Sequence, residues 1–300
     1  MPNLEHIKQL ALIGSTASGK TSLAIKAAQH LDAHILSLDS LSIYKEIDIV
    51  SAKPTPEERQ GIKHFGIDCI YPNEDFDVTT FIGLYHEVYR RCQEEKKNLV
   101  IVGGTSFYLK MLLEGVSELP FISEEIKNET NKYLLDLPKT YTWLLDLDPE
   151  HMSKIKSNDS YRIEKALNIY LETGQIPSEY FKTYPPQPVI TASLPIYQIE
   201  WKREILRERI ALRTKIMVEN GLIDEICGLE KKYSRTPHCM KAIGIKETLA
   251  YLDGIYSKNE MIEKITTNTA RLAKRQKTFN SSQFENVTKG SVRELEKILL

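Results

Sequence analysis

Residues 14 to 21 read Gly-Ser-Thr-Ala-Ser-Gly-Lys-Thr, the complete pattern G-x-x-x-x-G-K-[ST] of a phosphate-binding loop. An apolar run ends just before this segment, and a helical pattern begins at Lys20. In a strand, loop and helix of this kind, backbone N–H groups and the positive end of the helix surround a phosphate, and the lysine adds a point charge. We therefore predict a diphosphate or nucleotide site, with the Thr21 hydroxyl placed for Mg²⁺, made of Gly14, Ser15, Thr16, Ala17, Ser18, Gly19, Lys20 and Thr21.

Composition restricts the class of protein but not its partner. The 300 residues are 41% hydrophobic, which suffices for one large core or for a core with an inserted subdomain. Lys and Arg (40) nearly balance Asp and Glu (41), so only local charge clusters can indicate a partner. Scattered cysteines without C-x-x-C spacing favour reduced thiols, and no uncharged apolar run approaches the ~18 residues of a membrane span. We expect a cytoplasmic protein without a membrane partner.

Short apolar runs alternate with helical patterns in the first third of the chain. The runs cover residues 34–38, 65–70 and 99–102, and helical patterns begin at Thr55 and at Val78. This alternation predicts a parallel sheet. Residues 120–191 are mostly helical in pattern, before a further strand and a helical tail. We predict an α/β fold, with a P-loop NTPase-like sheet core flanked by helices in 1–119 and 192–300 and a helical insertion in 120–191.

The ends of two predicted strands carry polar residues with more than one interpretation. An NTPase usually has an aspartate after its second apolar strand, but here Leu99–Val102 ends in two glycines and Thr105. Asp39 instead follows an earlier strand, which would place it across the carboxyl edge of the sheet from the phosphates. Asp39 can act as a base in group transfer or cap a turn, and Thr105 can contact a ligand or cap a helix. The residues alone leave these alternatives open.

Two clusters of basic residues lie on predicted helices. One contains Arg203, Arg207, Arg209 and Arg213, and the other contains Arg271, Lys274 and Arg275. The second set has i, i+3, i+4 spacing, so its side chains share a face that can follow a nucleic-acid backbone. A solvated charged face is the alternative for either cluster. Combined with a phosphate site, the clusters favour local binding of RNA.

A series of short segments also stands in a characteristic order. They are Gly14 to Thr21, Asp39-Ser40 with Tyr44, Ser51 to Thr55, Val102 to Thr105 with Tyr108, Asn158-Asp159 with Arg162 and Ala166-Leu167, Ala242 to Gly244 with Lys246-Glu247, and Ala273 to Gln276. In this order the chain resembles the tRNA dimethylallyltransferases over almost its whole length. The resemblance implies transfer of a dimethylallyl group from dimethylallyl diphosphate to the exocyclic amine of the adenosine at tRNA position 37, with release of diphosphate.

The resemblance also implies roles for single residues. The loop would hold the diphosphate of the donor with Mg²⁺, although such a loop is also described as an ATP-binding or nucleotide-binding site. Asp39 would accept the proton of the amine, and Thr105, Arg213 and Lys20 would stabilise the leaving oxygen. The residues that would contact tRNA are Asp39, Ser40, Leu41, Ser42, Thr105, Tyr161, Arg162, Lys165, Arg271, Lys274 and Arg275. We expect a monomer whose partners are tRNA and dimethylallyl diphosphate.

The chain departs from the usual pattern of this family at three places. Ser15 replaces a proline, Phe279 replaces a tryptophan, and Ala270 stands where an arginine is usual, with Arg271 one place later. Other functions also fit the isolated motifs. A small-molecule kinase would use the loop for ATP and Asp39 to deprotonate an alcohol. A nucleotide-gated RNA-binding module would need no chemistry, and a prenyltransferase for free adenine nucleotides would not need the insertion.

Overall fold

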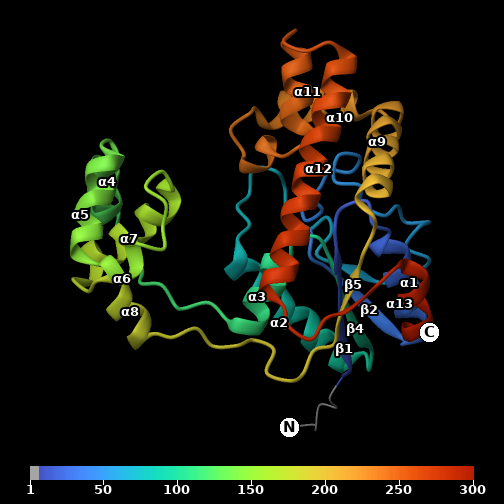
Figure 1. The fold of residues 1–300 in the computed structure, drawn as a ribbon, viewed down its shortest axis with the longest axis horizontal. Coiled ribbons are helices and arrows are strands. Elements are labelled where there is room, and N and C mark those ends of the chain that lie inside the picture. Colours follow the sequence, from blue (N-terminus) through green and yellow to red (C-terminus); the bar gives the residue numbers. More distant parts are fainter. Residues whose placement is uncertain (1–6) are drawn as a thin grey trace. The chain divides into compact units, whose positions relative to one another are not determined.

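The computed structural model describes residues 7–300, and within them the strands form one parallel sheet in the order β3-β2-β4-β1-β5-β6 (Figure 1). All strand pairs are parallel, which confirms the predicted α/β class. The strands are β1 (Gln9–Gly14), β2 (Ala33–Ser37), β3 (His64–Phe65), β4 (Asn98–Gly103), β5 (Ile196–Ile199) and β6 (Thr288–Gly290).

Helices follow most of the strands, as parallel connections require. They are α1 (Lys20–His30), α2 (Val78–Glu94), α3 (Ser106–Glu114), α4 (Glu124–Leu134), α5 (Leu137–Leu147), α6 (Pro149–Met152), α7 (Ser160–Thr173), α8 (Pro177–Thr183), α9 (Arg203–Glu219), α10 (Leu222–Tyr233), η1 (His238–Lys241), α11 (Ile245–Leu252), α12 (Lys258–Gln283) and α13 (Val292–Leu299). Within the described residues, no helix is long and apolar enough to cross a membrane.

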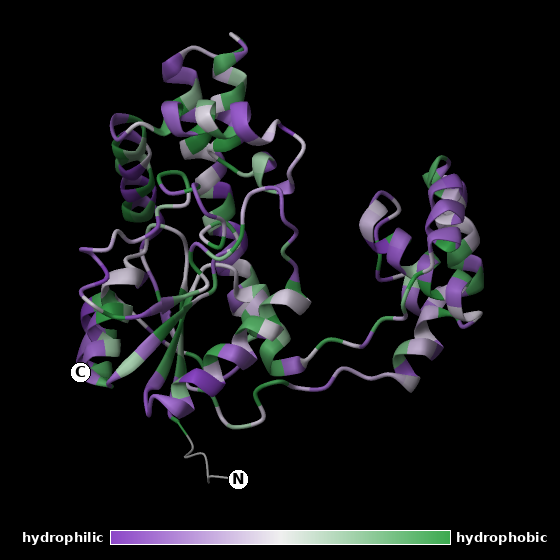
Figure 2. Cartoon of the chain, turned by 180° about the vertical axis from the view of Figure 1, so that it is seen from behind, coloured by the Kyte–Doolittle hydropathy of each residue, from purple (hydrophilic) through white to green (hydrophobic). Residues whose placement is uncertain are grey.

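The centre of the sheet is apolar because helices cover it on both faces. Strand β1 contributes Ala11, Leu12 and Ile13, each with no exposed surface. Helices α1 and α13 pack together on one face, whereas α2 and α12 contact the strands on the other. Hydrophobic residues therefore gather along the strands and the inner sides of these helices (Figure 2). The buried strand β1 therefore holds the loop between β1 and α1 in place at one edge of the sheet.

A second apolar cluster joins α9, α10, α11 and α12 to the segment that follows β2. Its buried members include Ile43, Ile47, Leu222 and Ile226. The carboxylate of Glu225 accepts three backbone N–H bonds, from residues 48, 49 and 50, at 2.7–3.0 Å. This carboxylate satisfies donors that no strand or helix pairs, and it holds the segment after β2 against α10.

Two local expectations from the sequence are wrong. The strand expected at 65–70 is limited to His64–Phe65, and Ile70 forms only an isolated bridge with Tyr44. The helix expected from Thr55 does not form, although Thr55 and Glu58 exchange the hydrogen bonds of a capping box. Gln60 (φ 50°) and Gly61 (φ 76°) adopt left-handed conformations, which end the turn before a helix can propagate.

The chain divides into two compact units. One contains the sheet and runs up to Leu112 and again from Ile190 to Leu300, and the other is Leu113–Val189. Helices α4 to α8 fill the second unit, as the helical pattern predicts, around a core that includes Leu144, Met152 and Ile163. A buried hydrogen bond from Thr130 to Asn168 (2.6 Å) ties α4 to α7. The second unit therefore has a core of its own.

Candidate active site

The loop between β1 and α1 presents backbone donors toward an anion. Gly19 adopts a left-handed conformation (φ 91°) that a side chain would strain, so glycine is required at the start of α1. None of the described residues caps this end of α1 with a side chain, and its first turn carries no acidic residue. The first N–H groups of α1 and its positive dipole end are thus left for a ligand, as a phosphate site requires.

Residues from β5 and α9 fix the outside of the loop. The Trp201 indole donates to the carbonyl of Ser18 (2.8 Å), and Arg209 Nε donates to the carbonyl of Ala17 (2.8 Å). The Arg209 guanidinium lies 4.9 Å from the centre of a Trp201 ring, within cation–π range. The basic cluster on α9 therefore supports the loop through at least one arginine, which sequence reasoning did not assign.

Two cations, Lys20 and Arg213, lie beside the loop. Lys20 Nζ donates to the carbonyl of Ser15 (2.7 Å), and Arg213 Nη2 donates to Thr16 Oγ1 (2.7 Å). The pKa of Lys20 is lowered to about 7, mainly by burial and also by the charge of Arg213, while the charge of Asp39 acts in the opposite direction. Burial also lowers the pKa of Arg213. Both shifts indicate unbalanced positive charge that an anionic ligand would relieve.

Asp39 follows β2 at the same edge of the sheet. Its Oδ1 accepts hydrogen bonds from the backbone N–H groups of Leu41 (2.9 Å) and Ser42 (3.1 Å), so the carboxylate does cap a turn. Its Oδ2 accepts no hydrogen bond from the described residues. The charge of Asp39 raises the pKa values of both Lys20 and Arg213, so the carboxylate partly offsets the effect of burial on the two cations. One oxygen fixes the turn, and the other remains available for chemistry.

Thr105 lies beside Asp39 because β2 and β4 are neighbours in the sheet. The Thr105 N–H donates to the carbonyl of Leu38 (2.9 Å), and its Oγ1 accepts from the Ser40 N–H (3.3 Å). The approach of the two strand ends is close: a Cβ at Gly103 would lie 2.5 Å from the carbonyl oxygen of Leu38. The glycine before Thr105 thus allows the backbone contact that brings Thr105 to Ser40.

Gln276 on α12 joins the loop to the end of β4. Its Oε1 accepts from the Thr16 N–H (2.9 Å), and its Nε2 donates to the carbonyl of Gly104 (3.0 Å). One turn earlier, the carbonyl of Ala273 accepts from Ser15 Oγ (3.2 Å). Sequence reasoning placed Gln276 in a family segment but gave it no role. Its i+3 spacing from Ala273 was the available signal, since it puts both residues on one helix face.

The residues expected to contact RNA are distributed over both units. Arg271, Lys274 and Arg275 are exposed on α12. In the helical unit, α7 exposes Tyr161 and Arg162, and Lys165 Nζ lies 5.3 Å from the centre of the Tyr161 ring. The three residues after Asp39 that are expected to contact tRNA differ in exposure: Ser40 is exposed, Leu41 is half-buried and Ser42 is buried. Ser42 reaches the site through its backbone N–H, which holds Asp39.

Thr21 is the residue of the loop that can contact a metal ion. It is exposed in the first turn of α1, and its hydroxyl has no hydrogen-bond partner among the described residues. The residues that the structure describes contain no cluster of three or more His, Cys, Asp and Glu side chains suited to a metal. A cation here would take its other ligands from phosphate oxygens and water, which is the usual coordination of Mg²⁺.

These features define a class: an α/β protein with a glycine loop suited to a phosphorylated compound, and with a carboxylate and a hydroxyl at the ends of neighbouring strands. Residues 42–283 match the family model described as IPP transferase. The chain is 72% identical to the tRNA dimethylallyltransferase of Sulfurovum sp., over 99% of this chain and 98% of that protein. It is 56% identical to that of Sulfurimonas denitrificans, over 97% and 98% respectively. The chain therefore belongs to the tRNA dimethylallyltransferase family, as the sequence motifs indicated.

Solved structures agree with this assignment. The full-length tRNA isopentenylpyrophosphate transferase of Bacillus halodurans superposes with a TM-score of 0.71 at 29% identity, over 98% of this chain and 96% of that one. A eukaryotic dimethylallyltransferase, described as acting on tRNA, gives a TM-score of 0.82 at 25% identity, over 94% of this chain and 74% of that one.

Proposed function

We propose that this protein transfers the dimethylallyl group of dimethylallyl diphosphate to the exocyclic amine of the adenosine at tRNA position 37. The observation that carries the proposal is the arrangement at the carboxyl edge of the sheet. There Asp39 follows β2, Thr105 follows the adjacent β4, and the charge of Asp39 reaches both cations of the loop. Membership of the family supports the identity of donor and acceptor.

The diphosphate of the donor occupies the loop in this proposal. Backbone N–H groups at the start of α1 bind its oxygens, and Lys20 and Arg213 neutralise its charge. Thr21 would bind Mg²⁺ together with those oxygens, and the ion would supply further charge neutralisation to the leaving diphosphate. The match between two half-buried cations and a multiply charged anion supports a diphosphate rather than a neutral ligand.

The chemical step forms a carbon–nitrogen bond between the adenosine amine and the allylic carbon, and it breaks the bond from that carbon to the bridging oxygen. The electron pair of the broken bond leaves with diphosphate, where Arg213, Lys20 and the Thr105 hydroxyl stabilise the growing charge. The amine loses a proton, which the free Oδ2 of Asp39 accepts. A positioned base of this kind contributes about 10²–10⁴-fold to a rate.

The RNA is held by exposed basic and aromatic side chains in this proposal. Arg271, Lys274 and Arg275 on α12 would bind phosphates, and Tyr161, Arg162 and Lys165 on α7 would bind the anticodon stem-loop from the helical unit. An enzyme that acts on a base takes it out of the stack, so the adenosine would enter beside Ser40, Leu41 and Ser42. We place the protein, as a monomer, in the cytoplasm, where its tRNA substrate is found.

The test is incubation of the purified protein with labelled dimethylallyl diphosphate, Mg²⁺ and bulk tRNA, followed by nucleoside analysis. The proposal expects label on adenosine in tRNA, loss of label with Asp39→Ala, and retained RNA affinity in that variant. Free AMP in place of tRNA serves as the control acceptor and should remain unlabelled. Unlabelled RNA, or ATP turnover that needs no tRNA, would contradict the proposal and favour a kinase.

A further inference from the structure

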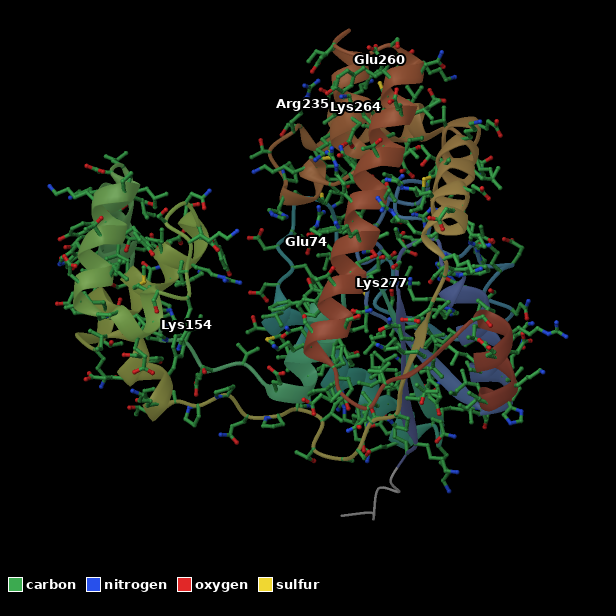
Figure 3. All side chains as sticks on the ribbon, in the orientation of Figure 1. Glu74, Lys154, Arg235, Glu260, Lys264 and Lys277 are labelled. Carbon is green, nitrogen blue, oxygen red and sulfur yellow. The ribbon has the colours of Figure 1, made fainter. Side chains whose placement is uncertain are left out.

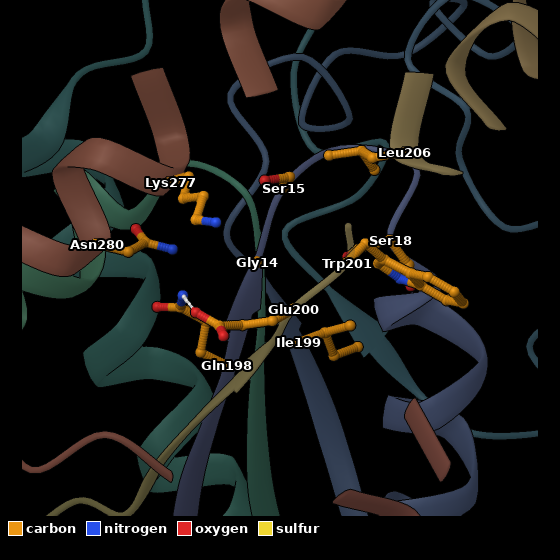
Figure 4. Close-up of a pocket in the computed structure, with 10 residues that line it drawn as sticks. All are labelled: Gly14, Ser15, Ser18, Gln198, Ile199, Glu200, Trp201, Leu206, Lys277 and Asn280. Atoms are coloured by element: carbon orange, nitrogen blue, oxygen red, sulfur yellow. Dashed lines mark hydrogen bonds between the residues drawn. The ribbon is translucent and has the colours of Figure 1, made fainter. Parts of the chain in front are cut away.

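Lys53 is a buried cation that the proposed reaction does not use. It lies in the connection between β2 and β3, in the segment Ser51 to Thr55, which belongs to the family motifs but was given no role. Lys277, labelled on α12 in Figure 3, instead lines a small pocket beside Gly14 and Ser15 of the phosphate loop (Figure 4). Lys53 does not line that pocket, and its side chain is only 4% exposed. The contacts that bury it therefore lie elsewhere.

Three oxygen atoms surround the ammonium group of Lys53. It donates to the carbonyl of Tyr44 (2.5 Å) and to carboxylate oxygens of Asp48 (2.8 Å) and Asp68 (2.7 Å). An ammonium group has three donors and no acceptor, so these bonds use its whole capacity. A buried charge is costly unless it is paired and hydrogen-bonded, and both conditions are met here. With no donor left for a ligand, Lys53 is suited to hold the chain rather than to bind a substrate.

One route from Lys53 to Asp39 passes through Tyr44. The carbonyl of Tyr44 accepts from Lys53, and the N–H of Tyr44 donates to the carbonyl of Leu41 (3.3 Å). The N–H of Leu41 donates in turn to Asp39 Oδ1 (2.9 Å). Tyr44 is itself 6% exposed and belongs to the apolar cluster that joins α9 to α12. The ammonium group is thus connected to the first of the two donors that hold Asp39.

A second route passes through Asp68. Its backbone N–H donates to the carbonyl of Ser42 (3.1 Å), and the N–H of Ser42 donates to Asp39 Oδ1 (3.1 Å). Asp68 adopts a left-handed conformation (φ 56°), which is uncommon for residues other than glycine. Its carboxylate contacts Lys53 through Oδ1 and Arg59 through Oδ2 (3.4 Å). Both carboxylate oxygens therefore anchor a residue whose backbone supports the turn at Asp39.

We propose that Lys53 is a positioning residue for Asp39, which keeps the turn closed so that the second carboxylate oxygen stays directed to the reacting amine. Both residues that donate to Asp39 are held through their carbonyl groups by residues that bind Lys53. The proposal rests on the proposed function, because Asp39 is a base only in that reaction. A base must stay within hydrogen-bond reach of its proton, and a displacement of about 1 Å can lower a rate by about 10²-fold.

Hydrogen exchange in the ligand-free protein tests the positioning without any chemistry. Lys53→Met keeps the length of the side chain and removes its charge, so the turn should open more often. We expect amide exchange at Leu41 and Ser42 to become about tenfold faster, with exchange in β1 and β4 unchanged. Lys45→Met is the matched control, because Lys45 lies in the same connection with its ammonium group over the Tyr71 ring (4.3 Å). Its exchange should equal that of the wild type.

Single-turnover rates separate positioning from general support of the fold. Asp68→Asn and Asp48→Asn each remove one charged partner of Lys53, but only Asp68 continues to the turn. Asparagine also tolerates the left-handed conformation at this position. With saturating donor and tRNA, we expect Lys53→Met and Asp68→Asn to be slower by about tenfold or more. Asp48→Asn should react at the wild-type rate, and the KM for the donor and the affinity for tRNA should stay unchanged in all three variants.

Several results would overturn the positioning role. They are a wild-type rate in Lys53→Met, equal losses in the two asparagine variants, and exchange that rises equally in the turn and in the sheet. A higher KM for the donor at an unchanged rate would also overturn it, because Lys53 would then act on the phosphate loop. If the wild-type protein transfers no prenyl group, the proposed function fails, and the exchange measurement still decides whether Lys53 holds the turn.

Discussion

At the scale of the residue, the site is a balance between two half-buried cations and one carboxylate. The charge of Arg213 lowers the pKa of Lys20, the charge of Arg209 lowers that of Arg213, and Asp39 compensates both only in part. Lys20 donates to the carbonyl of Ser15 in the loop. The two cations carry more positive charge than the carboxylate balances, and a bound diphosphate would neutralise the excess.

This balance predicts that diphosphate binding takes up a proton. The pKa of Lys20 falls from an ordinary 10.5 to about 7, so the amine is largely neutral at pH 8, and a bound anion raises its pKa again. Titration calorimetry at pH 8, in buffers of different ionisation enthalpy, should detect uptake of up to about one proton by Lys20. The contribution of Lys20 to diphosphate affinity should fall as the pH rises above 7. Proton uptake on binding should vanish below about pH 6, where Lys20 is already charged.

The control for the proton uptake is Lys20→Arg, because a guanidinium stays charged over this pH range. Pyrophosphate itself titrates, so the difference between the two proteins isolates the lysine. Equal proton uptake in both proteins would contradict the assignment.

The lowered pKa of Lys20 also affects stability. The folded state binds fewer protons than the unfolded state between about pH 7 and 10.5, so Lys20 makes the free energy of unfolding rise with pH over that window.

Sequence reasoning at this scale identified residues that belong to local motifs. Lys20 and the loop follow from spacing alone, and Asp39 follows from its position after a strand. Gln276 was assigned no role because its partner Thr16 is 260 positions away, and only the packing of α12 beside the loop brings them together. The support that Trp201 and Arg209 give the loop was not predicted for the same reason, since both contacts join residues nearly 200 positions apart in sequence.

At the scale of the element, the ends of adjacent strands determine which side chains meet. The predicted order of strands was enough to expect Asp39 and Thr105 at one edge of the sheet. The exact bounds of the short elements could not be predicted from the sequence. The turn at Thr55 begins as a helix would, yet two left-handed residues end it, and no periodicity indicates this. Helix α12 supplies the third wall of the site, because one of its faces contacts the loop and the end of β4.

Two glycines are expected to respond in opposite ways to alanine, because one lies at the close contact between β2 and β4 and the other lies in open space on a helix. Gly103→Ala puts a methyl group 2.5 Å from the backbone oxygen of Leu38, so the strand ends must separate. We expect a loss of about 1–3 kcal/mol in the free energy of unfolding. Gly228→Ala, in the middle of α10 with no atom within 4 Å of the new methyl, should instead gain about 0.4–1 kcal/mol. Thermal unfolding of both variants measures the difference, and equal melting temperatures would refute it.

The bridge from α12 predicts a selective effect on the donor. Gln276→Ala removes the acceptor of the Thr16 N–H and the donor to the Gly104 carbonyl. Loosening of the loop should raise the KM for dimethylallyl diphosphate about tenfold, the equivalent of about 1.4 kcal/mol, while kcat changes less. Steady-state kinetics with varied donor measures this. A change confined to the KM for tRNA would show that Gln276 acts on the RNA instead.

At the scale of the whole molecule, the chain combines a sheet unit that carries the chemistry with a helical unit that has its own core. Exposed basic residues occur in both, on α12 and on α7, although the net charge of the chain is only −1. RNA binding in this account depends on local faces rather than on overall charge, so its salt dependence should follow individual side chains.

Removal of two of these charges should weaken RNA binding without affecting the donor. For the double variant Lys274→Ala and Arg275→Ala, we expect the slope of log K against log salt concentration to fall in magnitude by about 1–2. The double variant Arg293→Ala and Lys297→Ala, at exposed positions of α13, is the matched loss of two charges and should leave the slope unchanged. Filter binding of tRNA over a salt series measures both. Identical slopes would remove α12 from the RNA interface.

The central claim is that Asp39 takes the proton from the adenosine amine while the loop holds the leaving diphosphate. The most direct measurement is the single-turnover rate of prenyl transfer in Asp39→Asn, with saturating donor and tRNA. Asparagine keeps an oxygen for the N–H groups of Leu41 and Ser42, so the turn is retained and the base alone is lost. The account predicts a rate lower by about 10²–10⁴-fold with unchanged affinity for tRNA. A variant that transfers the prenyl group at the wild-type rate would contradict it.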